Sequence, residues 1–150
     1  FLLLTSVYIF RFFITSFISS HSVPSNMFQK LLLHIFKSGG DWAFNRFVCS
    51  RQGDYLVSIE TEEEWQFINN EIQKHGTWNT SAWHIGLHQI DKAWTWLSGE
   101  RLIISKWRNC KPGGKYKKAE ISKNGGLFNA ISWYDENKYI CELPGGKITF

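Results

Sequence analysis

The spacing of hydrophobic and polar positions divides the chain into two parts. Over residues 41–53 and 61–76, apolar side chains recur three and four positions apart, which predicts two short helices. Apolar runs at 28–36 and 55–59 fit strands that lie before and between these helices. Beyond Gly76 the apolar residues form short runs separated by turn residues, which predicts five further strands, at 83–87, 94–97, 102–104, 127–131 and 138–142.

Both predicted helices begin with a capping signal. Asp41 follows a glycine pair and is a good N-cap, while Thr61 and Glu64 form a capping box. Two helices followed by several short strands indicate an α+β domain with a mostly antiparallel sheet. Residues 106–123 show no clear periodicity, so we expect a long loop there, and loops of that length are commonly functional.

Composition supports one globular domain with a strongly localised charge. The chain has 150 residues, of which 43% are hydrophobic, and its 17% aromatic share with 8 Trp favours strands and loops over a helical bundle. Its net charge of +4 is uneven, because the segment from Arg101 to Lys123 holds eight basic residues and one acidic residue. We therefore expect one strongly basic region on an otherwise near-neutral surface.

Residues 1–27 are set apart from the domain, which we place at residues 28–150. The first eighteen residues are apolar apart from Arg11 and a few hydroxyl side chains. This pattern fits three interpretations: the remainder of a signal peptide, a signal anchor that spans a membrane, or a fragment of another origin. Arg11 argues against a comfortable membrane span, and the sequence does not choose among the three.

The cysteines and one short motif bear on the cellular compartment. With three cysteines and no C-x-x-C pair, the chain lacks the ligands of a four-coordinate structural zinc site. In the secretory pathway one pair of cysteines would bridge and one thiol would be left over. The sequence Asn79-Thr80-Ser81 is an acceptor for N-glycosylation and fits that compartment.

The order of short motifs along residues 31–143 resembles the C-type lectin-like domain family. The motifs include GDYLVSI at 53–59, WTWLSG at 94–99 and YICE at 139–142, and His84 departs from the tryptophan that usually precedes I-G-L. The other matching segments are 43–49, 61–64, 85–87 and Trp107. Seven weak motifs in the right order make a chance match improbable, and the resemblance implies the C-type lectin-like fold with a long loop.

The resemblance also implies how the cysteines are used. It pairs Cys49 with Cys141, which lie at the end of the first helix and in the last strand. The family's second bridge is missing, because its two positions match Lys118 and Trp133. We expect Trp133 to fill the volume that this bridge would occupy. Cys110 is then the odd thiol, either an unpaired buried cysteine or the link in a disulfide-linked dimer.

Calcium and sugar binding depend on two triplets in this family. An E-P-N or Q-P-D triplet matches Lys111-Pro112-Gly113 here, and the W-N-D triplet matches Phe128-Asn129-Ala130. Calcium requires six to eight oxygen ligands, and Asn129 is the one ligand type left in these triplets. A lysine in place of a carboxylate would in addition repel the ion. We therefore expect no calcium, no other metal and no cofactor, with calcium-dependent carbohydrate binding as the alternative.

The basic long loop is the candidate binding site. Its cations would attract a sulfated glycan or an acidic protein surface, and the candidate residues are Arg108, Lys111, Lys115, Lys117, Lys118 and Asn129. Two alternatives stay open: a solvated loop without a ligand, and a purely structural module of a larger receptor or matrix protein. Nucleic acid is disfavoured, because Tyr116 is the one aromatic residue among the loop lysines.

No enzymatic motif stands out. His84 and His88 are four apart, but the local pattern predicts a strand, and Ile85 stands where a metalloprotease motif requires glutamate. The nucleophile, phosphate-loop and dinucleotide motifs are likewise missing. The sequence thus predicts a non-catalytic recognition domain of an extracellular protein, either secreted or anchored at the cell surface.

Overall fold

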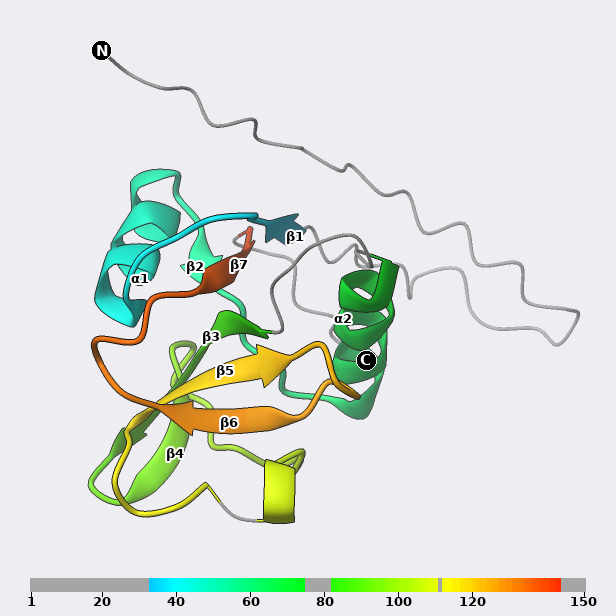
Figure 1. Ribbon diagram of the computed structural model, residues 1–150, viewed down its shortest axis with the longest axis vertical. Helices are drawn as coiled ribbons and strands as arrows, with labels where there is room; N and C mark the ends of the chain where they lie inside the picture. Colours follow the sequence, from blue (N-terminus) through cyan, green and yellow to red (C-terminus); the bar gives the residue numbers. More distant parts are fainter. Residues whose placement is uncertain (1–32, 75–81, 111, 144–150) are drawn as a thin grey trace, which may run out of the picture.

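The computed structural model describes residues 33–74, 82–110 and 112–143. Two helices, α1 (Trp42–Arg51) and α2 (Glu62–Lys74), occur among seven strands (Figure 1). The strands are β1 (Leu33–Ile35), β2 (Tyr55–Leu56), β3 (Ala82–Ile90), β4 (Ala93–Trp96), β5 (Lys118–Ser122), β6 (Phe128–Ile131) and β7 (Lys138–Glu142), and a single 3₁₀ turn, η1, covers Arg108–Cys110. The predicted α+β class is confirmed.

The described strands form one connected sheet with the order β1-β7-β3-β5-β6. β2 joins it beside β7, and β4 pairs with β3. The pairing of β3 with β7 is parallel, and the other strand pairs are antiparallel. The last strand, β7, therefore lies inside the sheet between β1 and β3, where it joins the N-terminal strands to the later ones.

Both helices begin as the sequence predicts. The Asp41 carboxylate accepts a hydrogen bond from the backbone N–H of Phe44 (2.8 Å). At α2, the N–H of Glu64 donates to Thr61 Oγ1 (3.2 Å), and the Glu64 carboxylate accepts from the N–H of Thr61 (3.1 Å). This reciprocal pair is the capping box, and it satisfies backbone donors that the first turn of a helix leaves without intrahelical partners.

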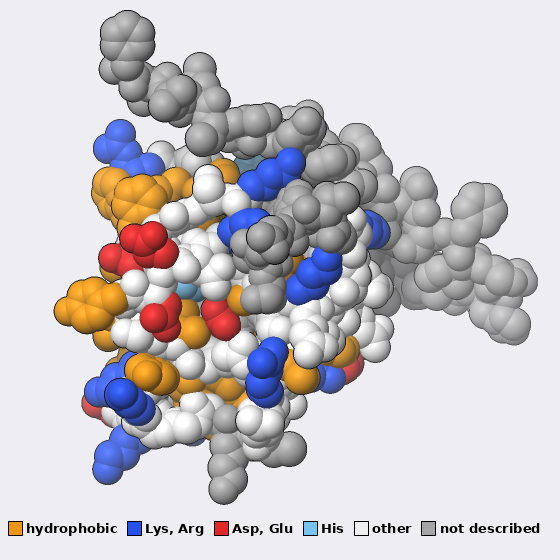
Figure 2. All heavy atoms as spheres, viewed as in Figure 1, with side chains coloured by type: hydrophobic (Ala, Val, Ile, Leu, Met, Phe, Trp, Pro, Cys, Tyr) orange, Lys and Arg blue, Asp and Glu red, His pale blue; other side chains and the backbone are white. Residues whose placement is uncertain are grey.

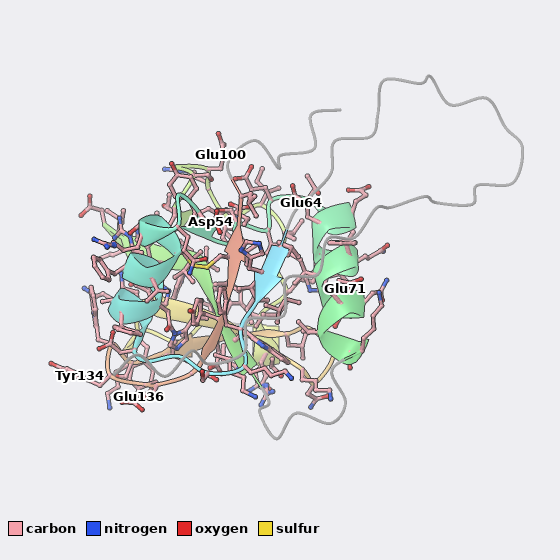
Figure 3. The ribbon with its side chains drawn as sticks, turned by 90° about the horizontal axis from the view of Figure 1, so that it is seen from above. Asp54, Glu64, Glu71, Glu100, Tyr134 and Glu136 are labelled. Atoms are coloured by element: carbon pink, nitrogen blue, oxygen red, sulfur yellow. A yellow bond between two sulfur atoms is a disulfide. The ribbon has the colours of Figure 1, made fainter. Side chains whose placement is uncertain are left out.

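The helices pack on different parts of the sheet. In Figure 3 the strands lie between α1 and α2. Ile68 and Ile72 of α2 are fully buried in a large cluster that includes Trp83, Ile85 and Ile121. A smaller cluster on the α1 side contains Trp42, Cys49, Leu56, Ile131, Tyr139 and Cys141. Burial of large aliphatic side chains contributes about 1.5–3 kcal/mol each, so the α2 cluster makes the larger contribution to stability.

A disulfide joins Cys49 of α1 to Cys141 of β7, as the resemblance implied. The Cα atoms of this pair are 5.6 Å apart, and 92 positions separate the two residues in the sequence. In the chain-entropy model, closing a loop of this length contributes on the order of 4–5 kcal/mol. The bridge therefore fixes the first helix to the central strand of the sheet.

The predictions for two segments were wrong. No strand forms at 102–104, where Ile103 is 80% exposed while its two apolar neighbours pack against the core. In the opposite direction, the segment expected to be a loop contains β5. Buried Ala119 and Ile121 alternate there with the polar residues Lys118 and Glu120. The polar side chains of this strand also pack against the rest of the protein, so the segment lacks the run of apolar residues from which a buried strand is predicted.

Candidate functional site

The structure divides the predicted basic residues among different environments. Lys115 and Lys117 are exposed in the connection that leads into β5, and the carbonyl of Lys117 accepts a hydrogen bond from the N–H of Gln89 (2.9 Å). This bond holds the connection against the end of the β3–β4 hairpin. Figure 2 shows Lys and Arg side chains gathered at the lower left, over this end of the molecule.

Arg108 lies apart from the two exposed lysines. Its guanidinium donates to Ser122 Oγ (3.0 Å) at the far end of β5, whereas Lys117 precedes the start of that strand. At ~3.3 Å per residue, the length of β5 separates these ends by roughly 13 Å. Arg108 therefore does not share one compact cluster with Lys115 and Lys117. Lys111 lies outside the described residues.

One cation that the sequence analysis missed lies near the exposed lysines. Lys92 is exposed in the hairpin turn, where Asp91 and Lys92 both have positive φ (48° and 67°), and its carbonyl accepts a hydrogen bond from Gln89 Nε2 (3.5 Å). Because the N–H of Gln89 donates to the carbonyl of Lys117, Gln89 joins the two segments. Arg46, exposed on α1, lies instead 5.8 Å from the Trp42 ring. We call Lys92, Lys115 and Lys117 the basic surface.

Lys118, unlike Lys115 and Lys117, is buried and does not belong to this surface. It is 6% exposed, and its ammonium lies 4.1 Å from the ring centroids of both Trp42 and Trp133. Burial, with a smaller contribution from the positive charge of Arg46, lowers the pKa of Lys118 to about 8. Its partners are the two rings, so it is not available to a ligand.

Trp133 does not fill a sealed cavity. Half of it (50%) is exposed, and its ring meets Trp42 edge-on with the centroids 6.4 Å apart. The Lys118 ammonium also lies 4.1 Å from the centroid of the Trp133 ring. The volume that we expected Trp133 to fill alone is thus shared by the Lys118 ammonium and the rings of Trp42 and Trp133, and part of Trp133 reaches solvent.

Asn129 belongs to a partly buried polar cluster rather than to the basic surface. Its amide donates to one oxygen of Glu120 (3.0 Å), and the amide of Asn137 donates to the other (2.7 Å). Burial raises the pKa of Glu120, while these two hydrogen bonds oppose the rise. The carboxylate is therefore committed to neighbouring amides within the fold.

His84 is fully buried beside this cluster. Its Nδ1 lies 2.8 Å from the Asn45 side-chain nitrogen, which is also within hydrogen-bond distance of the carbonyls of Gly40 (3.0 Å) and Asn137 (2.9 Å), so three acceptors share its two hydrogens. Burial lowers the pKa of His84 to about 4, although the charges of Asp135 and Asp41 oppose this change. A neutral imidazole here joins α1 to β3, which is a structural use of the histidine.

The residues that the resemblance matches to the calcium triplets offer few oxygen ligands. Gly113 and Ala130 carry no side-chain oxygen, and the Asn129 side-chain nitrogen donates to Glu120. Calcium would need six to eight oxygen ligands, and these residues supply far fewer. Within residues 33–74, 82–110 and 112–143, no group of three or more His, Cys, Asp or Glu is arranged to hold a metal ion.

Comparison with known proteins agrees with this architecture. The family described as "Lectin C-type domain" matches residues 39–143. The mouse protein C-type lectin domain family 4 member A is 30% identical over 118 residues, which cover 75% of this chain and 48% of the mouse protein. The chain therefore spans less than two thirds of the curated relatives that it matches first.

Solved structures show the same fold. Human lithostathine superposes with a TM-score of 0.69 at 21% identity, covering 81% of this chain and 90% of that one. The structure of SPL-1 in complex with GlcNAc gives a TM-score of 0.68 at 18% identity, covering 75% and 86%. The family match and the shared fold together define the class of protein. The chain belongs to the C-type lectin domain family.

Proposed function

We propose that this chain is a calcium-independent recognition domain of an extracellular protein, and that it binds an anionic ligand through the basic surface. C-type lectin domains are generally recognition modules, and this one carries three exposed cations from two separate segments that meet at Gln89. The gathering of these cations is the observation that carries the proposal. The family supports a non-catalytic role.

A sulfated glycan is the ligand class that fits best, with an acidic protein surface as the other form of the same chemistry. Clustered cations raise the local concentration of polyanions and speed their association. Tyr116, 38% exposed and 5.2 Å from the Lys115 ammonium, adds a flat apolar surface on which a sugar ring can pack. The cations come from a hairpin and a loop, so an extended anion suits them better than a small one.

Calcium-dependent carbohydrate binding is the second candidate. It is favoured by the fold that this chain shares with the SPL-1–GlcNAc complex. The residues at the calcium triplets argue against it, since Asn129 is the one matching ligand type that they retain.

The placement of the protein outside the cell rests on the family and on the Cys49–Cys141 disulfide, because disulfides persist in oxidising compartments. No helix within the described part of the chain is long and apolar enough to cross a bilayer. The anchor or signal role of residues 1–27 and the glycosylation of Asn79 concern residues outside the described ranges. A dimer linked through Cys110 stays a prediction.

Binding to immobilised heparin tests the proposed function. Lys117→Glu reverses one charge of the basic surface, and Arg51→Glu, at the exposed end of α1, makes the same change of charge elsewhere. We expect the first variant to elute at clearly lower salt than the parent, the second to elute close to it, and both to melt like the parent. Equal losses in the two variants would mean that net charge, rather than this surface, governs binding.

A further inference from the structure

The loop between β6 and β7 exposes two adjacent aromatic side chains. Trp133 is 50% exposed, and Tyr134, at 86%, is the most exposed large hydrophobic residue in the described part of the chain. In Figure 3, Tyr134 and Glu136 lie at the outer edge of the molecule, beside α1. Scattered single apolar residues are normal on a protein surface. A Trp–Tyr pair on one short loop is the composition that binding surfaces favour.

Hydrogen bonds hold this loop in place. The N–H of Ser132 donates to Asp135 Oδ2 (2.8 Å), and the N–H of Asn137 donates to the carbonyl of Gly40 (3.0 Å). The Asn137 side chain also donates to Glu120 on β5. The loop thus presents Tyr134 from a backbone fixed at both ends, which lowers the entropy that a partner must remove on binding.

On its solvent side, Tyr134 is followed in the chain by two exposed carboxylates, whereas the ring of its neighbour Trp133 contacts the Lys118 ammonium. Asp135 and Glu136 are exposed, and within the described residues neither forms a salt bridge. Asp41, the N-cap of α1, adds to the negative field, since both it and Asp135 act on buried His84. Figure 2 shows carboxylates beside the aromatic side chain that projects at the left edge. On a chain of net charge +4, this face attracts cations.

The chain itself shows how such a combination holds a cation. The Lys106 ammonium lies 3.8 Å from the Trp65 ring centroid and 2.6 Å from Glu62 Oε1. One ring and one carboxylate together bind one cationic side chain there. Tyr134 with Asp135 and Glu136 offers the same two chemical groups, and here they face solvent. Arginine suits such a site better than lysine, because its planar guanidinium both stacks on rings and pairs with carboxylates.

We propose that this aromatic–acidic face (Trp133, Tyr134, Asp135 and Glu136) binds an arginine-bearing segment of a protein partner. The guanidinium stacks on the exposed ring of Tyr134 and pairs with the carboxylates of Asp135 and Glu136. This face is distinct from the basic surface in both position and charge. The domain accordingly has two binding faces, one for anionic and one for cationic groups.

Calorimetric titration with two short peptides tests the proposal. One peptide carries three arginines separated by glycines, and the other carries citrulline, the neutral isostere, at the same positions. We expect the arginine peptide to bind in low salt, the citrulline peptide to bind at least about tenfold more weakly, and added salt to weaken the first. Equal binding of both peptides, or no binding of either, would overturn the proposal.

Matched variants locate the site. Tyr134→Ala and Glu136→Gln are each expected to weaken binding of the arginine peptide about threefold or more. Glu63→Gln, which removes an exposed carboxylate from the first turn of α2, is expected to leave binding unchanged. Lys117→Glu is also expected not to weaken it, which separates this site from the heparin site. Equal losses for Glu63→Gln and Glu136→Gln, or binding of neutral oligosaccharides in place of the peptide, would refute the assignment.

Discussion

The ammonium of Lys118 lies 4.1 Å from the ring centroid of Trp133. The sequence resemblance matches these two positions to the family's second disulfide, so on that prediction a cation–π contact takes the place of a covalent bond. The same ammonium is 4.1 Å from the Trp42 ring, which extends the contact to α1. A contact that involves a largely desolvated cation contributes about 0.5–2 kcal/mol, less than a typical disulfide.

Removal of the Trp133 ring tests this contact. Trp133→Ala leaves the buried Lys118 with one aromatic partner, so we expect the free energy of unfolding to fall by about 1–2 kcal/mol. Urea unfolding of the oxidised protein measures the change. Tyr134→Ala is the control, because that neighbouring side chain is 86% exposed, and its loss should change stability by less than about 0.5 kcal/mol. Equal effects of the two substitutions would argue against a structural role for the Lys118–Trp133 pair.

Buried His84 predicts a loss of stability in acid. The unfolded chain takes up a proton near the ordinary pKa of 6.5, whereas the folded protein does so near a pKa of about 4. Between these values the unfolded state binds more protons, so the free energy of unfolding decreases as the pH falls, by up to roughly 3 kcal/mol. Glu120, whose pKa is raised, acts in the opposite direction and reduces the net effect.

Comparison with His84→Gln isolates this contribution. Glutamine does not titrate, and its amide oxygen can accept the hydrogen bond from Asn45. Urea unfolding at about pH 7 and about pH 4.5 should show a smaller loss of stability on acidification for the variant than for the parent. Parallel losses in the two proteins would show that other groups control the acid sensitivity.

Local signals in the sequence predicted much of the fold. Asp41 and the Thr61–Glu64 capping box marked the start of both helices, and the family motifs implied the Cys49–Cys141 bridge. Strand β5 was missed because polar residues such as Lys118 are buried in it. The Lys118 ammonium packs against Trp42 of α1, a position that its charge would have placed in solvent. Sequence patterns report the chemistry of a side chain, and they do not report what packs against it.

The candidate site was harder to predict for the same reason. Lys117 and Lys118 are adjacent in sequence, yet one is exposed and the other is buried between two tryptophans. Arg108 belongs to the same charged segment but lies at the other end of β5. Lys92 approaches the loop through the pairing of the β3–β4 hairpin with it, which a count of charges along the chain does not capture.

Thermal unfolding in millimolar calcium and in chelator tests calcium independence, the central claim, most directly. A ligand that binds the native state alone raises stability by RT ln(1 + [L]/Kd), and an occupied site should raise the midpoint by several degrees. The residues at 112–113 and 128–130 predict the same midpoint in both buffers for the oxidised protein. A clear upward shift in calcium would contradict the account and make calcium-dependent glycan binding the leading function.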